Sequence, residues 1–197
     1  MTSPNAIQFG QYYHIYNRGN NLENIFREER NYDFFLNKYA QYVTPIAETF
    51  AYCLLKNHFH LMVRIKYQDE LDPTLHNKKP GQGFGNLFNA YAKAFNKLYQ
   101  RSGSLFQNPF GRVEVTSDWQ LFQLVIYIHQ NPARHGFVDD FRDWPYSSYQ
   151  TFTSSQPTWL KRDEVIDWFG GMINLEVAHE TKVKENQVQN LVPEEFD

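Results

Sequence analysis

The sequence predicts an α+β fold of the ferredoxin-like (split βαβ) type, an antiparallel sheet with helices on one face and an extra C-terminal helix. Strand-like and helix-like segments follow the order β-α-β-β-α-β through residues 12–115. Only two residues separate the middle pair of strands, which is typical of an antiparallel hairpin. A further amphipathic helix starts near residue 117, and an aromatic content of 17% supplies enough apolar surface for an ordinary core.

The first half of the chain contains three predicted strands and one helix. Residues 12–16 are aromatic and β-branched, and a turn at 18–21 ends this strand. Residues 30–43 carry apolar side chains at helical spacing, and Pro45 prevents the helix from continuing. Residues 50–55 and 58–65 are apolar runs joined by Lys56-Asn57, so we expect a hairpin.

The second half begins with a linker over residues 67–83, rich in Asp, Lys, Pro and Gly. A helix is predicted over 84–98, and a fourth strand within 105–115, where Pro109 limits pairing to the later part. Ser117 and Gln120 form a capping-box pattern that starts the next helix. Helical signals return at 160–169 and end at Gly170-Gly171.

The chain divides by composition into a domain over residues 1–150 and an acidic C-terminal extension with short helices over 151–197. The formal net charge of −3 conceals an uneven distribution. Residues 76–138 carry seven basic and two acidic side chains, whereas residues 139–197 carry five basic and twelve acidic ones. A local basic stretch suits phosphate binding, although a solvated lysine face is its commoner cause.

The sequence also favours a protein of the cytoplasm. A single cysteine, Cys53, cannot form an intramolecular disulfide and fits a reducing compartment. The first residues lack the basic-then-apolar order of a signal peptide, and no window reaches the length of a membrane span. We therefore expect no membrane partner.

His58-Phe59-His60 is the clearest local sign of chemistry. Alternate residues of a strand point to one side, so both imidazoles share a face while Phe59 points to the other. Two neutral imidazoles can hold a divalent ion, but a third ligand must come from elsewhere. Taken alone, the pair is weak evidence for a metal, and an exposed or core pair of strand histidines is the commoner explanation.

Tyr127 lies on the helix that begins after Ser117, about 110° from the centre of its apolar stripe. Its helical neighbours are polar, so core packing does not explain a tyrosine there, although an interfacial tyrosine remains an alternative. Asn131 follows one turn later, where Pro132 suggests a helix end and a free amide. His129 points away from Tyr127, and we interpret it as structural.

These residue types suit phosphodiester transesterification. A phenol has a pKa near 10 and is a poor nucleophile unless it is activated or the barrier at phosphorus is lowered. A divalent ion on His58 and His60 can polarise a phosphate oxygen and stabilise the departing 3′ oxygen. For single-stranded DNA, exposed aromatic rings can stack on bases while basic side chains contact phosphates. The candidate phosphate contacts are Arg18, Lys93, Lys97, Arg101 and Arg112.

With these residues in view, the chain resembles the HUH single-tyrosine transposases, particularly the REP-associated tyrosine transposase branch. The resemblance runs from about residue 12 to residue 149 and depends on five segments in a fixed order, which are residues 13–19, 54–63, 103–106, 127–132 and 144–149. One departure is Lys56, where the family often has proline; it affects the turn and leaves the presumed ligands in place.

The resemblance implies a catalytic domain over residues 1–150 that nicks and rejoins single-stranded DNA beside imperfect hairpins. It implies Mg²⁺ or Mn²⁺ on His58, His60 and Asn131, and Tyr127 as the nucleophile that forms a 5′-phosphotyrosine. The expected partner is single-stranded or hairpin DNA, and a homodimer is compatible with the sequence.

Two other functions stay open at this point. A domesticated hairpin-binding protein would keep the fold without cleavage, and a metal-dependent hydrolase of small phosphates would use Tyr127 only to orient its substrate. A covalent protein–DNA adduct would separate strand transfer from both.

Overall fold

The computed structural model describes residues 6–184 and 188–192. Its centre is a four-stranded sheet in the order β2-β3-β1-β4, in which every neighbouring pair is antiparallel. The strands are β1 (Tyr12–Arg18), β2 (Ala47–Leu54), β3 (His58–Ile65) and β4 (Gly111–Val115). With the helices α1 (Glu29–Tyr42) and α2 (Gln82–Leu98), they follow the predicted β-α-β-β-α-β order, so the predicted α+β fold is confirmed.

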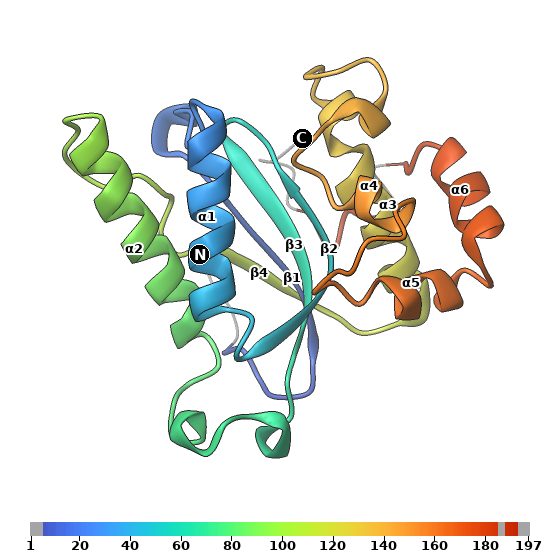
Figure 1. The fold of residues 1–197 in the computed structure, drawn as a ribbon, viewed down its shortest axis with the longest axis horizontal. Helices are drawn as coiled ribbons and strands as arrows, with labels where there is room; N and C mark the ends of the chain where they lie inside the picture. Colours follow the sequence, from blue (N-terminus) through green and yellow to red (C-terminus); the bar gives the residue numbers. More distant parts are fainter. Residues whose placement is uncertain (1–5, 185–187, 193–197) are drawn as a thin grey trace.

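Helices α1 and α2 cover one face of the sheet (Figure 1). The alternation of β3 sends Phe59, Leu61 and Val63 to this face, where they join a large apolar cluster with both helices. Full burial of each such side chain contributes about 1.5–3 kcal/mol, so this cluster holds the helices on the sheet. His58, His60 and the buried Met62 alternate with these residues and point to the opposite face.

The opposite face is covered by the extra helix that the sequence predicts, which carries Tyr127. Helix α3 (Asp118–Arg134) packs against β2 and β3 on that side (Figure 1). The short helices α4 (Tyr149–Phe152), α5 (Arg162–Trp168) and α6 (Met172–Glu180) follow, and Trp168 of α5 stacks on Phe50 of β2. Residues 188–192 add Val188, Leu191 and Val192 to the same apolar cluster. The acidic extension therefore shares a core with α3.

Helix α3 begins as predicted and ends later. The Ser117 side chain accepts a hydrogen bond from the Gln120 amide at 3.3 Å, which is the expected N-cap. Pro132 does not end the helix, which continues to Arg134. The His135 amide donates to the Asn131 carbonyl at 3.0 Å and closes the last turn. Asn131 is consequently a helical residue whose backbone is fixed.

Other boundaries differ by a few residues from the predicted ones. Strand β2 starts three residues earlier than predicted, and its register with β3 shifts between Thr49 and Ala51. The linker contains two short 3-10 helices, Gln68–Glu70 and Pro73–Leu75. Within residues 6–184 and 188–192, no helix combines the length and the apolar character needed to cross a membrane.

Candidate metal and tyrosine site

The two histidines of the His-x-His motif lie side by side on the α3 face of β3. Their ring centroids are 5.1 Å apart, and the rings are nearly perpendicular. His58 is 3% exposed and His60 is fully buried. The predicted shared face is therefore confirmed. Because both rings are buried, their hydrogen-bond partners determine which ring nitrogen has a lone pair available for a ligand.

A chain of hydrogen bonds fixes the tautomer of His60. His14 Nδ1 lies 2.8 Å from the Leu191 carbonyl, which can only accept, so this nitrogen carries the proton. In neutral His14, Nε2 must then accept, and its partner is His60 Nδ1 at 3.0 Å. His60 therefore donates from Nδ1 and keeps its lone pair on Nε2, the arrangement that a metal-binding imidazole needs.

A second contact orients His58. Its Nδ1 lies 2.7 Å from Oδ1 of Asn57, the last residue of the tight turn before β3. If this contact is Nδ1–H donating to the amide oxygen, the lone pair of His58 is on Nε2. That nitrogen is buried and has no hydrogen-bond partner among the described residues. Such an atom is costly unless a ligand satisfies it.

Asn131 brings an amide to the same place from α3. Its Nδ2 donates to the Tyr127 carbonyl one turn earlier at 3.1 Å, which determines the direction of the side chain. Its Oδ1 is buried and, like His58 Nε2, has no hydrogen-bond partner in the part of the chain that the structure describes. The amide also lies close enough to His58 to raise the pKa of that imidazole. Strand β3 and helix α3 therefore place two unsatisfied acceptors beside each other.

Burial keeps these imidazoles neutral. Desolvation, aided by the charges of His135 and Arg18, lowers the pKa of His58 to about 3. Desolvation likewise lowers the pKa of His14 to about 4, and it holds the pKa of His60 well below its ordinary value. At neutral pH all three rings are therefore unprotonated at one nitrogen and can act as ligands or acceptors.

The donor set fits a divalent ion when the amide of Asn131 is included. Among residues 6–184 and 188–192, no three side chains from His, Cys, Asp and Glu are arranged to hold a metal. The site thus requires the amide oxygen as its third protein ligand. Amide oxygen is a usual ligand of Mg²⁺ and Mn²⁺, whereas imidazole favours first-row transition metals, so this mixed set suits Mn²⁺ better than Mg²⁺.

Tyr127 lies against this set, although its environment differs from the predicted one. Its ring centroid is 5.6 Å from that of His60, and the Arg134 guanidinium lies 5.2 Å from the ring centroid. The expectation that core packing does not explain this tyrosine is wrong, because Tyr127 is fully buried in an apolar cluster. That cluster also includes residues of the C-terminal extension, which the periodicity of the helix cannot reveal.

His129 has the structural environment that we inferred. Its Nδ1 lies 2.9 Å from His179 Nε2 on α6, and its Nε2 lies 2.7 Å from Ser148 Oγ. Gln130, also on α3, donates to the carbonyls of His179 and Thr181. This side of α3 is therefore attached to the extension and does not face the histidine motif.

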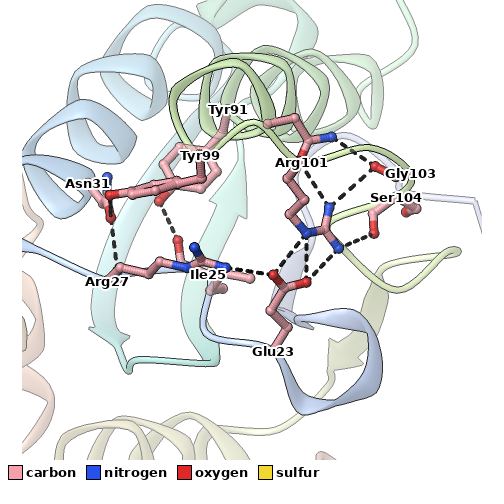
Figure 2. A network of polar contacts seen from close by, with 10 residues as sticks. Glu23, Ile25, Arg27, Asn31, Tyr91, Tyr99, Arg101, Gly103 and Ser104 are labelled. Carbon is pink, nitrogen blue, oxygen red and sulfur yellow. Dashed lines mark hydrogen bonds and ion pairs between the residues drawn. The ribbon is translucent and has the colours of Figure 1, made fainter.

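The predicted phosphate-binding residues separate into distinct places. Arg18 pairs with His58 in the strand register, and its charge lowers the pKa of both motif histidines, so it lies beside the site. Arg101 is held inside the protein by Glu23, by Asn96 and by the carbonyls of Gly103 and Ser104 (Figure 2). Such pairing argues for a structural role of Arg101 and against direct phosphate contact.

The other three basic residues lie away from the histidines. Lys93 and Lys97 are exposed on α2, on the opposite side of the sheet. Arg112, on β4, pairs with the inward-facing Ile15 and places its guanidinium 5.1 Å from the Phe110 ring centroid. Their role in DNA binding stays a prediction.

Sequence reasoning gave no role to His14, Asn57 or His135. The first two orient the motif histidines, and the His135 ring centroid is 4.7 Å from that of His58. One signal was available, because Asn57 immediately precedes the motif. The role of His14 depends on the pairing of β1 with β3, and this long-range register is not visible in the local sequence.

Comparison with known proteins shows what the chain as a whole is similar to. No protein-family model matches the chain. It is 31% identical over 104 residues to a curated Haemophilus influenzae protein provisionally named a REP-associated tyrosine transposase. The chain resembles the REP-associated tyrosine transposases. The match covers 52% of this chain and 58% of that transposase, so it spans little more than half of the relative's length.

A solved structure supports the same likeness at the level of the fold. It is described as a REP-associated tyrosine transposase bound to a REP hairpin, and it superposes on this chain with a TM-score of 0.57 at 17% identity. The superposition covers 80% of this chain and 88% of that transposase. The resemblance drawn from the sequence is therefore confirmed.

Proposed function

We propose that this protein is a metal-dependent strand transferase that cleaves single-stranded DNA near a hairpin through a 5′-phosphotyrosine. One observation carries the proposal. His58 Nε2 on β3 and Asn131 Oδ1 on α3 are buried without a hydrogen-bond partner among the described residues, and the neighbouring His60 lies against the ring of Tyr127. A core built only for stability would satisfy these atoms within the protein.

Each residue then has a distinct task. His58, His60 and Asn131 would hold Mg²⁺ or Mn²⁺, while Asn57 and His14 keep the two imidazoles in the ligating tautomer. The bound ion supplies Lewis-acid polarisation of a phosphate oxygen and stabilises negative charge on the departing 3′ oxygen. Arg18, beside His58, supplies positive charge toward the scissile phosphate.

Tyr127 supplies the nucleophile. Its phenolic oxygen forms a bond to phosphorus while the bond from phosphorus to the 3′ oxygen breaks. The phenol loses one proton and the departing 3′ oxygen gains one, so the step is balanced without an added reactant. A second 3′-hydroxyl can reverse the step, which restores the phosphodiester, releases Tyr127 and joins a new strand.

The burial of Tyr127 adds a requirement. A fully buried phenol cannot meet a DNA phosphate, so the cover over α3 must move before attack. Leu191 and Val192 are buried in the same apolar cluster as Tyr127, so we expect them to form part of that cover. We therefore expect DNA binding to precede exposure of the nucleophile.

The assignment of hairpin DNA as substrate is supported from two directions. The solved transposase of similar fold was bound to a REP hairpin, and the basic stretch of residues 76–138 suits phosphate contact. The geometry within one chain already brings Tyr127 to the histidines, which supports attack by the tyrosine of the same protomer. A homodimer stays a prediction.

A denaturing-gel assay tests the proposal. Labelled single-stranded hairpins from DNA that flanks the gene are incubated with the protein, with and without Mn²⁺ or Mg²⁺. We expect a metal-dependent covalent band that Tyr127→Phe eliminates. Tight hairpin binding without a band would favour the domesticated binder, and hydrolysis of small phosphates without a band would favour the hydrolase.

A further inference from the structure

A second feature lies on the other side of the sheet from Tyr127. A cavity of about 530 Å³ separates α2 from the segment of residues 103–110, and Asn17 of β1 reaches its wall. Cavities of this size are typical of small-ligand sites. None of the residues that line it belongs to the metal and tyrosine site.

Gly85 keeps this cavity open. It lies in the interior of α2, where glycine costs about 1 kcal/mol relative to alanine. No packing requirement explains it, because a Cβ at Gly85 would meet no heavy atom within 4 Å. By contrast, a Cβ at Gly83 on the same helix would approach the Tyr42 carbonyl to 2.5 Å. The effect of glycine at position 85 is therefore to leave space in the cavity, and it relieves no close contact with a neighbouring atom.

The lining suits a flat ring with polar edges. Phe88 and Phe110 meet at the wall with ring centroids 5.2 Å apart, and Phe110 is only partly buried. Side-chain amides of Asn89, Gln107 and Asn108 surround these rings and offer both donors and acceptors. A nucleobase presents this combination, because its faces stack on aromatic rings and its edge forms hydrogen bonds with amides.

The wall of the cavity is held firmly. Arg101 binds Glu23, with Nε to Oε2 at 2.7 Å, and donates to the carbonyls of Gly103 and Ser104 (Figure 2). Asn20 adds hydrogen bonds to the carbonyls of Ser104 and Phe106 at 3.0 and 3.1 Å. The hydrogen bonds from Arg101 and Asn20 fix the backbone of this segment, and Glu23 holds Arg101 in turn. The segment is therefore ordered without filling the cavity, as expected of a preformed site.

Basic residues lie near the cavity. Asn17 lines it and donates to the Gln107 carbonyl, while the next residue along β1, Arg18, pairs with His58 in the strand register. Arg112 lies over the ring of Phe110, and Lys93 follows Asn89 by one turn of α2. These side chains supply positive charge that suits a sugar–phosphate backbone.

We propose that this cavity binds one unpaired nucleobase of the single-stranded DNA that flanks the cleavage site. The inference rests on the proposed function for the class of its ligand. It assigns a reading role to Asn89, Gln107 and Asn108, and it makes Arg101 a positioning residue that supports the wall of the pocket.

Binding of short DNA tests this inference independently of cleavage. The trinucleotides d(AAA), d(CCC), d(GGG) and d(TTT) are titrated into the protein while the side-chain amide signals of Asn89, Gln107 and Asn108 are followed by NMR. We expect at least one trinucleotide to shift them. Gly85→Leu, which fills the cavity, should weaken that binding about tenfold or more, in line with the contribution of one stacked base.

Asn86→Leu is the matched control, because it places the same side chain at the neighbouring exposed position outside the cavity. This variant should bind as the wild type does. Asn89→Ala gives a second test on an exposed position, and it should change which base binds best. The inference is overturned if no trinucleotide shifts the amide signals, or if Gly85→Leu binds as tightly as Asn86→Leu.

The two proposals can fail separately. Loss of base binding in Gly85→Leu, together with no covalent adduct in the wild type, would keep the base pocket and reject the strand transferase. If Gly85→Leu forms the adduct with the yield and base preference of the wild type, the strand transferase is kept and the base pocket is rejected.

Discussion

Two clusters of buried histidines lie on the same side of the sheet, and they differ in how their nitrogens are satisfied. The metal-side cluster consists of His14, His58 and His60, and the support cluster consists of His129 and His179. Burial lowers the pKa of all five rings, so neither exposure nor charge separates the clusters.

In the support cluster every ring nitrogen has a partner. His179 Nδ1 lies 2.7 Å from the Leu175 carbonyl and must donate to it, so His179 Nε2 accepts from His129 Nδ1. His129 Nε2 then accepts from the Ser148 hydroxyl at 2.7 Å. The network is closed, which is the state expected of buried polar groups that only stabilise a fold.

In the metal-side cluster the hydrogen bonds lead toward an unsatisfied place. The Leu191 carbonyl orients His14, His14 orients His60, and Asn57 orients His58. The described residues offer no hydrogen-bond partner to His58 Nε2 or Asn131 Oδ1. The comparison teaches that an incompletely satisfied network, rather than a buried histidine as such, distinguishes the candidate site.

The largest effect is expected at Tyr127. Tyr127→Phe should abolish the covalent adduct, because it removes the only oxygen proposed to attack phosphorus. Hairpin affinity, measured by fluorescence anisotropy, should stay within about twofold. An adduct of wild-type yield in this variant would show that another residue is the nucleophile.

The next largest effect separates the two clusters directly. His60→Ala should weaken Mn²⁺ binding by more than about 100-fold, since loss of a ligand exceeds the 10–100-fold typical of a ligand's supporting residue. Isothermal titration with Mn²⁺ measures this loss. The matched change His129→Ala should leave Mn²⁺ affinity unchanged, and equal losses in the two variants would remove the distinction between the clusters.

A smaller effect on the metal is expected at His14. His14→Phe keeps a ring of similar shape but cannot accept from His60 Nδ1, so Mn²⁺ affinity should fall about 10–100-fold. His14→Gln, which can still accept a hydrogen bond, should recover part of the loss. Wild-type affinity in His14→Phe would contradict the role of His14 in fixing the tautomer.

The last effect concerns stability in acid and is the smallest on the metal site itself. The pKa of His179 is about 4 in the folded protein because of its burial, against an ordinary 6.5. As the pH falls from 6.5 to 4, the unfolded chain binds a proton there that the folded chain does not. This one group should therefore remove about 1.4 kcal/mol of stability per pH unit over that range.

His179→Asn should make the loss of stability shallower by about that amount. Urea unfolding at pH 7.5, 6 and 5 measures the slope for both proteins, and adduct formation at pH 7.5 should persist in the variant. An unchanged slope would mean that His179 is already protonated in the folded state.

Sequence reasoning was most successful where local periodicity determines position. Alternation along a strand placed His58 and His60 on one face, and helical spacing placed Asn131 one turn after Tyr127. The strand and helix order followed equally from local patterns. These successes share one property, which is that the residues concerned lie within a few positions of each other.

What could not be predicted depends on long-range contacts. Tyr127 is buried in a cluster that includes residues beyond residue 160, and the role of His14 results from strand register and from Leu191. Arg101 looked like a phosphate ligand because its partner Glu23 is 78 positions away. Neither a helical period nor a charge count contains this information.

The hydrogen bond from His14 to Leu191 joins residues 177 positions apart, and it has a consequence for biosynthesis. A ribosome makes His14, His58 and His60 long before it makes Leu191, so a nascent chain can form the sheet while His60 still lacks its orienting contact. We expect metal affinity to mature only after Leu191 has been made. The proposed cutting centre would then form after the sheet that carries it, and chains that stop short of Leu191 would lack an oriented His14.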